Sequence, residues 1–570
     1  MVAGLAPSAP SRRVGKGLVV LALLVFVAFS SYGFTAPFYY GHYGYHGGSY
    51  ATWARGTLRH HTLYPINEPG FATPNPQTYY IHHPMLTHQL VTFTFLVFGE
   101  HEWSVRLAAL IPSTLSLLLV AAIAWRNRGP LAGGAAALVF AFVPVNIWYG
   151  SHIDQGFPSI ACLLAFFWFY LRWLQCARWP SALAALAFEA LAGCFEWSPY
   201  FAFPVIFAHA LWTGGRRGGR FRTFVLVHPL VAVVLPLGVH FWAVWRVGLL
   251  DDLLAAYRNR TAEISYRAFI DRMEEYAITL YGRVLMVAMV LWLCLALGRL
   301  VSRRGRAADL VGLTFAFALI SYMHVFKTAV VTHAYRQLYG NVWAALSVGD
   351  LVMQGGTLLR RKWPLRSGTS DGLGMAASLA VLALVTATTL PTSWAGLMES
   401  RLHGGVPGWK VFDPDLRQTA FASAIEGMTT QQDVLYYYPS FTWTPPHRMD
   451  WAFYYDRDPR RGRNLRSLTM LSPGERQHAV AIFFESELWG DERKAFAELA
   501  ARHPVFQVGD LAALDLRIEG ARISAYRLAP PSTVGRGILR QWLDGPYPFP
   551  RLLPDPALQS RVAAQVNEAR

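Results

Sequence analysis

Apolar runs of about 15 to 24 residues follow one another through the first 398 positions of this 570-residue chain. An α-helix needs about 20 apolar residues to cross the hydrocarbon core of a bilayer. Within that core a helix can satisfy all of its own backbone polar groups. Eleven runs therefore predict transmembrane helices: 17–36, 103–125, 131–149, 157–175, 181–195, 199–213, 223–246, 283–300, 308–326, 337–352 and 373–394.

The overall composition agrees with a membrane protein. Only 15% of the residues are charged, whereas soluble domains carry about 25%. Aromatic residues make up 14% of the chain, which excludes intrinsic disorder. The four cysteines, Cys162, Cys176, Cys194 and Cys294, lie in or directly after apolar runs, so neither a disulfide framework nor a cysteine metal site is expected.

The formal net charge of +16 is unevenly distributed. Residues 399–570 contain 21 basic and 20 acidic residues, so the excess lies almost entirely in the apolar part. Cytoplasmic loops of membrane proteins concentrate Lys and Arg, and the basic clusters alternate along the chain as this rule requires. The charge therefore predicts a multi-pass protein of the inner (plasma) membrane with a cytoplasmic N-terminus, and no nucleic-acid partner is expected.

The charge pattern also decides how to interpret the short run 85–98, which contains His88 and Gln89. If this run crossed the membrane, Arg126, Arg128 and the later basic clusters would lie opposite the basic N-terminus. We therefore expect 85–98 to be an interfacial or re-entrant helix on the outer face. The first apolar run lacks a convincing signal-peptide cleavage site and is expected to remain as an anchor.

The chain is predicted to contain two domains. Residues 1–397 would form the transmembrane domain, with a large first outer loop at 37–102, and residues 398–570 an extracytoplasmic α/β domain with a Pro-rich tail. Helix and strand patterns alternate in the second part. Helices are expected at 416–428 and 491–502, and strands at 433–440, 451–456, 479–486 and 523–528. The tail from 530 is expected to wrap the surface.

Several short motifs lie in or beside the predicted outer segments. They are SYATWARGTLRH at 49–60, HHPM at 82–85, FGEHEWSVRLAALIPS at 98–113, and Asp154 in the loop after the third run. In this order they resemble the GT-C class of membrane glycosyltransferases, in particular the protein O-mannosyltransferase and aminoarabinose-transferase (ArnT-like) superfamily. The resemblance covers residues 17–175 well and the rest only through topology.

The resemblance implies transfer of a sugar from a polyprenyl-phosphate donor on the outer face, normally with inversion. Relatives carry an Asp-Glu pair at the positions of His46 and Gly47, so the expected catalytic carboxylate is absent here. Three explanations remain open. His46, with His42, could replace the acid as base; Asp154 could be the sole carboxylate; or the activity could be lost.

Other residues are candidates for substrate binding. Arg106 matches the family's arginine and would pair with the donor phosphate, or else only snorkel to the interface. The remaining candidates are His42, His82, His83, Lys327, His333 and Arg336. A divalent metal held by His42, His46 and Asp154 is conceivable, although nothing in the sequence requires a cofactor.

Glu189 lies within an apolar run, where a carboxylate is costly. We interpret it as paired with a neighbouring helix, for example through His209 or His240, although it could instead face the site together with Glu196.

The sequence thus predicts a glycosyltransferase that moves a hexosyl or pentosyl group to an envelope glycan, lipid or protein. The rival interpretations are a transporter or flippase of lipid-linked sugars and a non-catalytic, glycan-binding relative. A transporter is expected to show inverted repeats, and the sequence shows none.

Overall fold

The computed structural model describes residues 9–38, 42–67, 69–154, 156–302, 305, 307–362, 367–402, 416–438, 453–461, 464–529, 537–544 and 549–568. The chain divides into two compact units. The first comprises 1–31, 81–87 and 107–398, and the second 32–80, 88–106 and 399–570. The second unit thus contains parts of the predicted first outer loop as well as the C-terminal part. A domain boundary at residue 398 stays a prediction.

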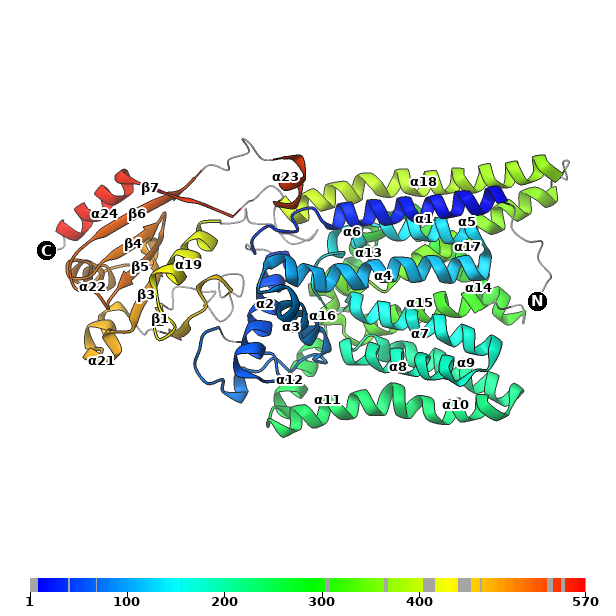
Figure 1. Ribbon diagram of the computed structural model, residues 1–570, viewed down its shortest axis with the longest axis horizontal. Coiled ribbons are helices and arrows are strands. Elements are labelled where there is room, and N and C mark those ends of the chain that lie inside the picture. Colours follow the sequence, from blue (N-terminus) through cyan, green and yellow to red (C-terminus); the bar gives the residue numbers. More distant parts are fainter. Residues whose placement is uncertain are drawn as a thin grey trace. The chain divides into compact units, whose positions relative to one another are not determined.

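The first unit is built from long helices that run side by side (Figure 1). Each of the eleven predicted ranges overlaps a helix. Three of the helices, α3, α4 and α18, have residues in both units. The elements are α1 (Ala9–Ser30), α3 (Leu86–Phe98), α4 (Glu102–Arg128), α5 (Pro130–Phe142), α6 (Pro144–Tyr149), α7 (Gly156–Cys176), α8 (Trp179–Phe195), α9 (Pro199–Arg217), α10 (Gly219–Pro229), the π-helix η2 (Leu230–Val234), α11 (Leu235–Arg246), α12 (Leu250–Arg260), α13 (Tyr266–Tyr281), α14 (Arg283–Val301), α15 (Ala307–Val325), α16 (Lys327–Thr332), η3 (Ala334–Gln337), α17 (Gly340–Lys362) and α18 (Ser367–Leu402).

Six helical segments in the described residues are long and apolar enough to cross a membrane. They are Pro10–Ser30, Glu102–Arg128, Gly156–Cys176, Gly219–Arg246, Arg283–Val301 and Ala334–Leu359. Shorter apolar helices accompany them, including α3, which covers the run predicted to be interfacial or re-entrant. Whether α3 crosses the membrane stays a prediction.

Proline and glycine set the helix boundaries. Gly129, with φ of 98°, separates α4 from α5, and α5 and α6 both begin with proline, which is favoured at the first helical position because it lacks an N–H group. Small residues allow α1 to pack closely along α5. A Cβ on Gly15 would meet the carbonyl oxygen of Pro130 at 2.5 Å, so a larger residue would push the two helices apart.

Four charged side chains form a buried network at one end of the first unit. Asp350 pairs with Arg128 at 2.8 Å and with Arg299 at 3.0 Å. Asp309 pairs with the same two arginines at 3.2 and 2.7 Å. Trp292 and Gln354 also donate hydrogen bonds to Asp350. The network joins α4, α14, α15 and α17.

Glu189 is paired inside the helix bundle, as expected, but its partner is neither of the two histidines proposed. Its Oε2 lies 2.7 Å from Nε2 of His228 on α10, and both side chains are buried. His209 instead contacts the hydroxyl of Tyr170 at 2.8 Å. A buried carboxylate needs a polar partner, and His228, which precedes the π-helix, is the one that the packing of α8 against this segment brings within reach.

The second unit contains a seven-stranded mixed sheet in the order β2-β1-β3-β5-β4-β6-β7. Strand β1 runs parallel to β2 and β3, β4 runs parallel to β6, and the remaining neighbours are antiparallel. The strands are β1 (Val434–Tyr437), β2 (Asp458–Arg461), β3 (Ala479–Phe484), β4 (Val505–Val508), β5 (Leu511–Asp515), β6 (Ile523–Leu528) and β7 (Leu552–Pro554).

Helices cover both faces of this sheet (Figure 1). Phe506 contacts Phe421 of α19 (Leu416–Met428), whereas Val505 belongs to the core formed with α22 (Asp491–Ala500) and α24 (Pro556–Glu568). Adjacent strand residues point to opposite faces, so the sheet lies between two helical layers. The other helical elements of this unit are α2 (His42–His60), η1 (Pro76–Thr78), η5 (Leu465–Met470), α21 (Pro473–Arg476), η6 (Glu485–Glu487) and α23 (Ile538–Asp544).

Two predictions for this part of the chain were wrong. Residues 453–455 are helical, and the strand that pairs with β1 begins at Asp458. The aromatic side chains that suggested a strand pack instead against Phe38, with the Phe453 ring 5.2 Å away. The tail does more than wrap the surface, because α24 contributes Val562 and Val566 to the core.

The segment 32–38 is bound to distant parts of the second unit. The backbone amides of Gly33 and Thr35 donate to the carbonyl groups of Trp542 and Leu543, both at 2.9 Å. The Thr35 hydroxyl donates to Asp544 at 2.7 Å, across 509 positions of sequence.

Acid is expected to weaken the C-terminal sheet through Asp433. Burial opposes ionisation of this carboxyl, but the Thr430 amide and Arg517 outweigh it, so its pKa is lowered. The contribution is complete above the unfolded pKa of about 3.9 and is lost as pH falls through the lower folded value. Asp433→Asn should lower the thermal midpoint at pH 7 and flatten its decline between pH 5 and 3. Glu498→Gln, an exposed change, serves as the control; equal declines in both variants would contradict the assignment.

Candidate active site

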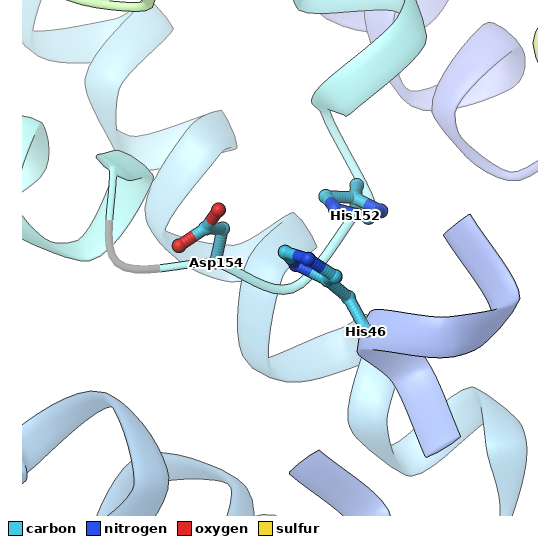
Figure 2. A group of neighbouring side chains, drawn as sticks. All are labelled: His46, His152 and Asp154. Atoms are coloured by element: carbon cyan, nitrogen blue, oxygen red, sulfur yellow. The ribbon is translucent and has the colours of Figure 1, made fainter. Parts of the chain in front are cut away.

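Asp154 lies on a short loop between α6 and α7, within the first unit. Figure 2 shows it on the same loop as His152, and both side chains are buried. Ser113 of α4 anchors this loop by donating a hydrogen bond of 2.6 Å to the carbonyl oxygen of Gly150. A side chain on Gly150 would meet the carbonyl oxygen of Asn146 at 2.7 Å, so glycine permits the tight turn that places Asp154.

A buried ion pair lies in the same unit. Arg336, on the 3₁₀ turn before α17, donates a hydrogen bond of 2.8 Å to Glu196, which caps the C-terminus of α8. The other terminal nitrogen of the guanidinium lies 3.5 Å from Nε2 of His83. Three residues distant in the sequence are thereby joined, and only His83 and Arg336 belong to the predicted site.

Asp154 interacts electrostatically with this pair. Burial raises the pKa of the Glu196 carboxyl, Arg336 lowers it, and the nearby Asp154 raises it further; the net shift is upward. Arg336 in turn interacts with Asp154. The site thus combines one buried guanidinium with two carboxyl groups, an arrangement that can both accept a proton and stabilise developing negative charge.

His333 and Lys327, both predicted to bind the donor, lie near one another in the chain. Burial, with Arg336 and Arg260 nearby, lowers the pKa of His333 to about 3, so its ring is neutral at pH 7. Lys327 is half-buried, with Nζ 5.8 Å from the Tyr266 ring. Arg336 and Arg260 are the cations that act on His333, and the sequence did not single out Arg260. A place for Lys327 in the same cluster stays a prediction.

Aromatic rings border the site within the first unit. The Arg336 guanidinium lies 4.9 Å from the Tyr335 ring, and Tyr335 contacts Tyr149 and His333 at centroid distances of 5.9 and 5.3 Å. Tyr149 also meets His152 edge-on at 5.3 Å. Rings with polar tips suit a ligand that has both apolar and hydrogen-bonding surfaces.

His82 and His83 point to different partners, although they are adjacent. His82 contacts Asp252 at 3.0 Å, and its carbonyl oxygen accepts hydrogen bonds from Trp197 and Arg260. Desolvation and Arg260 lower the pKa of the His82 ring. His82 therefore ties the HHPM motif to α12, whereas His83 is directed toward Arg336.

Arg106 lies in the second unit, near the start of α4. Its Nη1 donates to the carbonyl oxygens of Phe34 at 2.9 Å and of Ala36 at 2.5 Å, and the side chain is buried. These contacts hold the segment that follows α1. The predicted pairing of Arg106 with a phosphate stays a prediction.

His46 and His42 lie on α2, also in the second unit. The helix begins at His42, so the predicted helix at 49–60 is extended by two turns at its start. The side chain of His42 lies outside the described residues. His46, labelled in Figure 2, stands beside Tyr45 at a ring distance of 5.9 Å. Its proposed role as base, alone or with Asp154, stays a prediction.

His152 and Asp154 could contribute two ligands to a divalent cation, because imidazole and carboxylate are common metal ligands. They lie two residues apart on one loop. Sequence reasoning did not single out His152, since a lone histidine after a helix gives no signal by itself. The involvement of a metal in this protein stays a prediction.

Part of the chain is similar to a known protein family. Residues 82–245 match the family model of the dolichyl-phosphate-mannose-protein mannosyltransferases. The predicted family resemblance is confirmed. The matched segment contains His82, His83, Arg106, Asp154 and Glu196, whereas Arg336 lies outside it. A comparison with proteins of curated function found no match.

Solved structures of this class share the fold. ArnT from Cupriavidus metallidurans in the apo state is 14% identical, with a TM-score of 0.54 over 89% of this chain and 98% of that one. The same enzyme bound to undecaprenyl phosphate gives 0.55 over 88% and 97%. The Archaeoglobus fulgidus oligosaccharyltransferase in the apo form gives 0.50 at 13% identity, over 86% and 73%. The chain is a polytopic helical membrane protein with an ArnT-like fold and a C-terminal α/β domain.

Proposed function

We propose that this protein transfers a sugar from a polyprenyl-phosphate donor to an envelope glycan, lipid or protein. Three findings support this: the mannosyltransferase-family segment, the ArnT-like fold, and the similarity to an ArnT structure that contains undecaprenyl phosphate. The observation that carries the proposal is the buried Asp154 beside the Arg336–Glu196 pair.

In the proposed reaction the acceptor hydroxyl attacks the anomeric carbon of the sugar. Asp154 accepts the proton of that hydroxyl as the new C–O bond forms. The bond between the anomeric carbon and the phosphate oxygen breaks on the opposite side, which inverts the configuration. The polyprenyl phosphate leaves with the additional negative charge.

Arg336 would stabilise that charge, because a guanidinium pairs with two phosphate oxygens at once. Glu196 and His83 hold this guanidinium in position before the donor arrives, so little reorganisation accompanies the reaction. Lys327 and Arg260 would add positive charge for the donor phosphate. The positive-inside pattern supports an outward-facing site, an extracytoplasmic second unit and a cytoplasmic N-terminus.

The transfer reaction can be tested by following the lipid product. Purified protein in bilayers, given radiolabelled polyprenyl-phosphate hexoses or pentoses and an envelope extract, should release free polyprenyl phosphate. His46→Ala should reduce the release if His46 assists as base, with exposed His101→Ala as the matched control. Movement of intact lipid-linked sugar across the bilayer without cleavage would contradict a transferase and favour a flippase.

A further inference from the structure

A polar cavity of about 520 Å³ lies wholly within the second unit. Its walls come from α2, from the loop between α2 and η1, from the turn between α3 and α4, from the end of α19 and the turn after it, and from the two residues before β2. The lining residues are Arg55, Leu58, Arg59, Phe71, Glu100, Glu426, Gln431, Asp456 and Arg457. Neither the proposed transfer reaction nor the predicted site uses any of them.

Asp456 is the centre of a network of ion pairs and hydrogen bonds that forms the floor of the cavity. Arg59 donates two hydrogen bonds to its carboxylate, at 3.0 and 2.6 Å, and Arg55 lies 3.5 Å from it. Arg457, which is also buried, donates to the carbonyl oxygens of Asp456, Glu426 and Thr429. These contacts keep the polar floor rigid without a ligand, as a preformed binding site requires.

Asp456 has an unusual backbone conformation. Its φ of 39° lies in the left-handed region, which residues other than glycine adopt uncommonly, although Asp does so more often than most. Such strain concentrates at functional positions, where the surrounding contacts maintain it. Here the two arginines of α2 and the following Arg457 hold the turn that presents Asp456 to the cavity.

The charges of the lining are balanced. It contains three guanidinium groups and three carboxyl groups, and Arg55 also pairs with Glu100 at 2.5 Å. A phosphate or carboxylate ligand would meet acidic groups on several sides. A ligand with many hydroxyl groups offers both donors and acceptors, and can bind the carboxyl groups, the amide and the guanidinium groups together.

The rim offers side chains that a ligand can reach. Glu426 and Gln431 are exposed. Phe71 supplies an apolar ring, and the Arg59 guanidinium is stacked 3.6 Å from its centroid. Polar side chains that fix orientation beside an apolar wall are the usual composition of a small-molecule site.

We infer that this cavity binds a neutral oligosaccharide. The rigid charge-balanced floor, the strained turn at Asp456 and the reachable rim carry the inference together. Binding here does not depend on the proposed transfer reaction. In a transferase, the cavity would hold a part of the acceptor other than the reacting hydroxyl.

Titration calorimetry on the full-length protein in detergent tests the inference. The probes are maltohexaose, mannohexaose and xylohexaose, with mannose 6-phosphate as the anionic comparison. We expect at least one neutral hexasaccharide to bind. Glu426→Ala combined with Gln431→Ala should weaken it about tenfold or more, because two hydrogen-bonding groups are removed. These rim changes leave the ion pairs of the floor intact, so the protein should fold normally.

The control variant combines Gln432→Ala with Glu498→Ala, which removes the same residue types from exposed positions outside the cavity. It should bind as the unaltered protein does. The inference is overturned if no neutral probe binds, if the rim and control variants bind equally well, or if mannose 6-phosphate binds more tightly than every neutral probe. Because no donor is present, a failed titration is distinguishable from a failed transfer reaction.

Discussion

Replacing Asp154 with asparagine is expected to slow sugar transfer by a factor of about 10² to 10⁴, the usual contribution of a positioned general base. The amide keeps the size of the buried side chain but cannot accept the proton of the acceptor hydroxyl. The initial rate of polyprenyl phosphate release, measured at saturating donor, reports the change. Donor binding should be retained, since Arg336 keeps its contacts with Glu196 and His83.

The matched control is Asp251→Asn, which changes an exposed aspartate on α12. Its rate should equal that of the unaltered protein. If Asp154→Asn and Asp251→Asn both transfer sugar at rates within about twofold of the unaltered protein, Asp154 is not the base. A large loss in His46→Ala alone would then move the role to His46.

Replacing Asp350 with alanine is expected to destabilise the helix bundle by about 3–5 kcal/mol, the cost of breaking a buried ion pair from one side. Asp350 bonds to Arg128, Arg299, Trp292 and Gln354. Without Asp350, the guanidinium groups of Arg128 and Arg299 must share one carboxylate. Asp309 is the other acidic residue of the network as the described residues show it. Thermal unfolding of the purified protein in detergent should show a marked fall in the midpoint.

An exposed ion pair provides the comparison. Asp271 lies 4.0 Å from Arg267 on α13, and both side chains are largely exposed. Asp271→Ala should leave the midpoint unchanged, because solvent screens such pairs. Asp350→Asn should fall between the two, since the amide can still accept hydrogen bonds but carries no charge. Equal midpoints for the alanine variants would show that the buried network contributes no net stability.

The helical part of the fold could be predicted from sequence because its cause is local. A run such as 283–300 is apolar around the whole helix, and its length alone indicates a span. The sheet was harder to find. Strands β4 and β5 are short and buried along their whole length, so they show no polar/apolar alternation, and only Gly509-Asp510 between two apolar runs indicates their hairpin.

The sequence could not identify which residues pair with the buried carboxylates. Burial dictates that Glu189 and Glu196 must find polar partners, but many histidines and arginines could serve. His228 is 39 positions from Glu189, and Arg336 is 140 from Glu196. Only the packing of helices selects them. The same holds for the oligosaccharide cavity, whose lining residues come from five separate stretches of the chain.

The contact between Thr35 and Asp544 has a consequence for biosynthesis. The ribosome makes about 5–20 residues each second, so the 509 residues between these partners take about 25–100 s to emerge. Throughout that time the segment after α1 lacks its final hydrogen bonds, although the helix before it is already complete. The second unit can therefore complete its fold only near the end of translation, after most of the membrane helices have been synthesised.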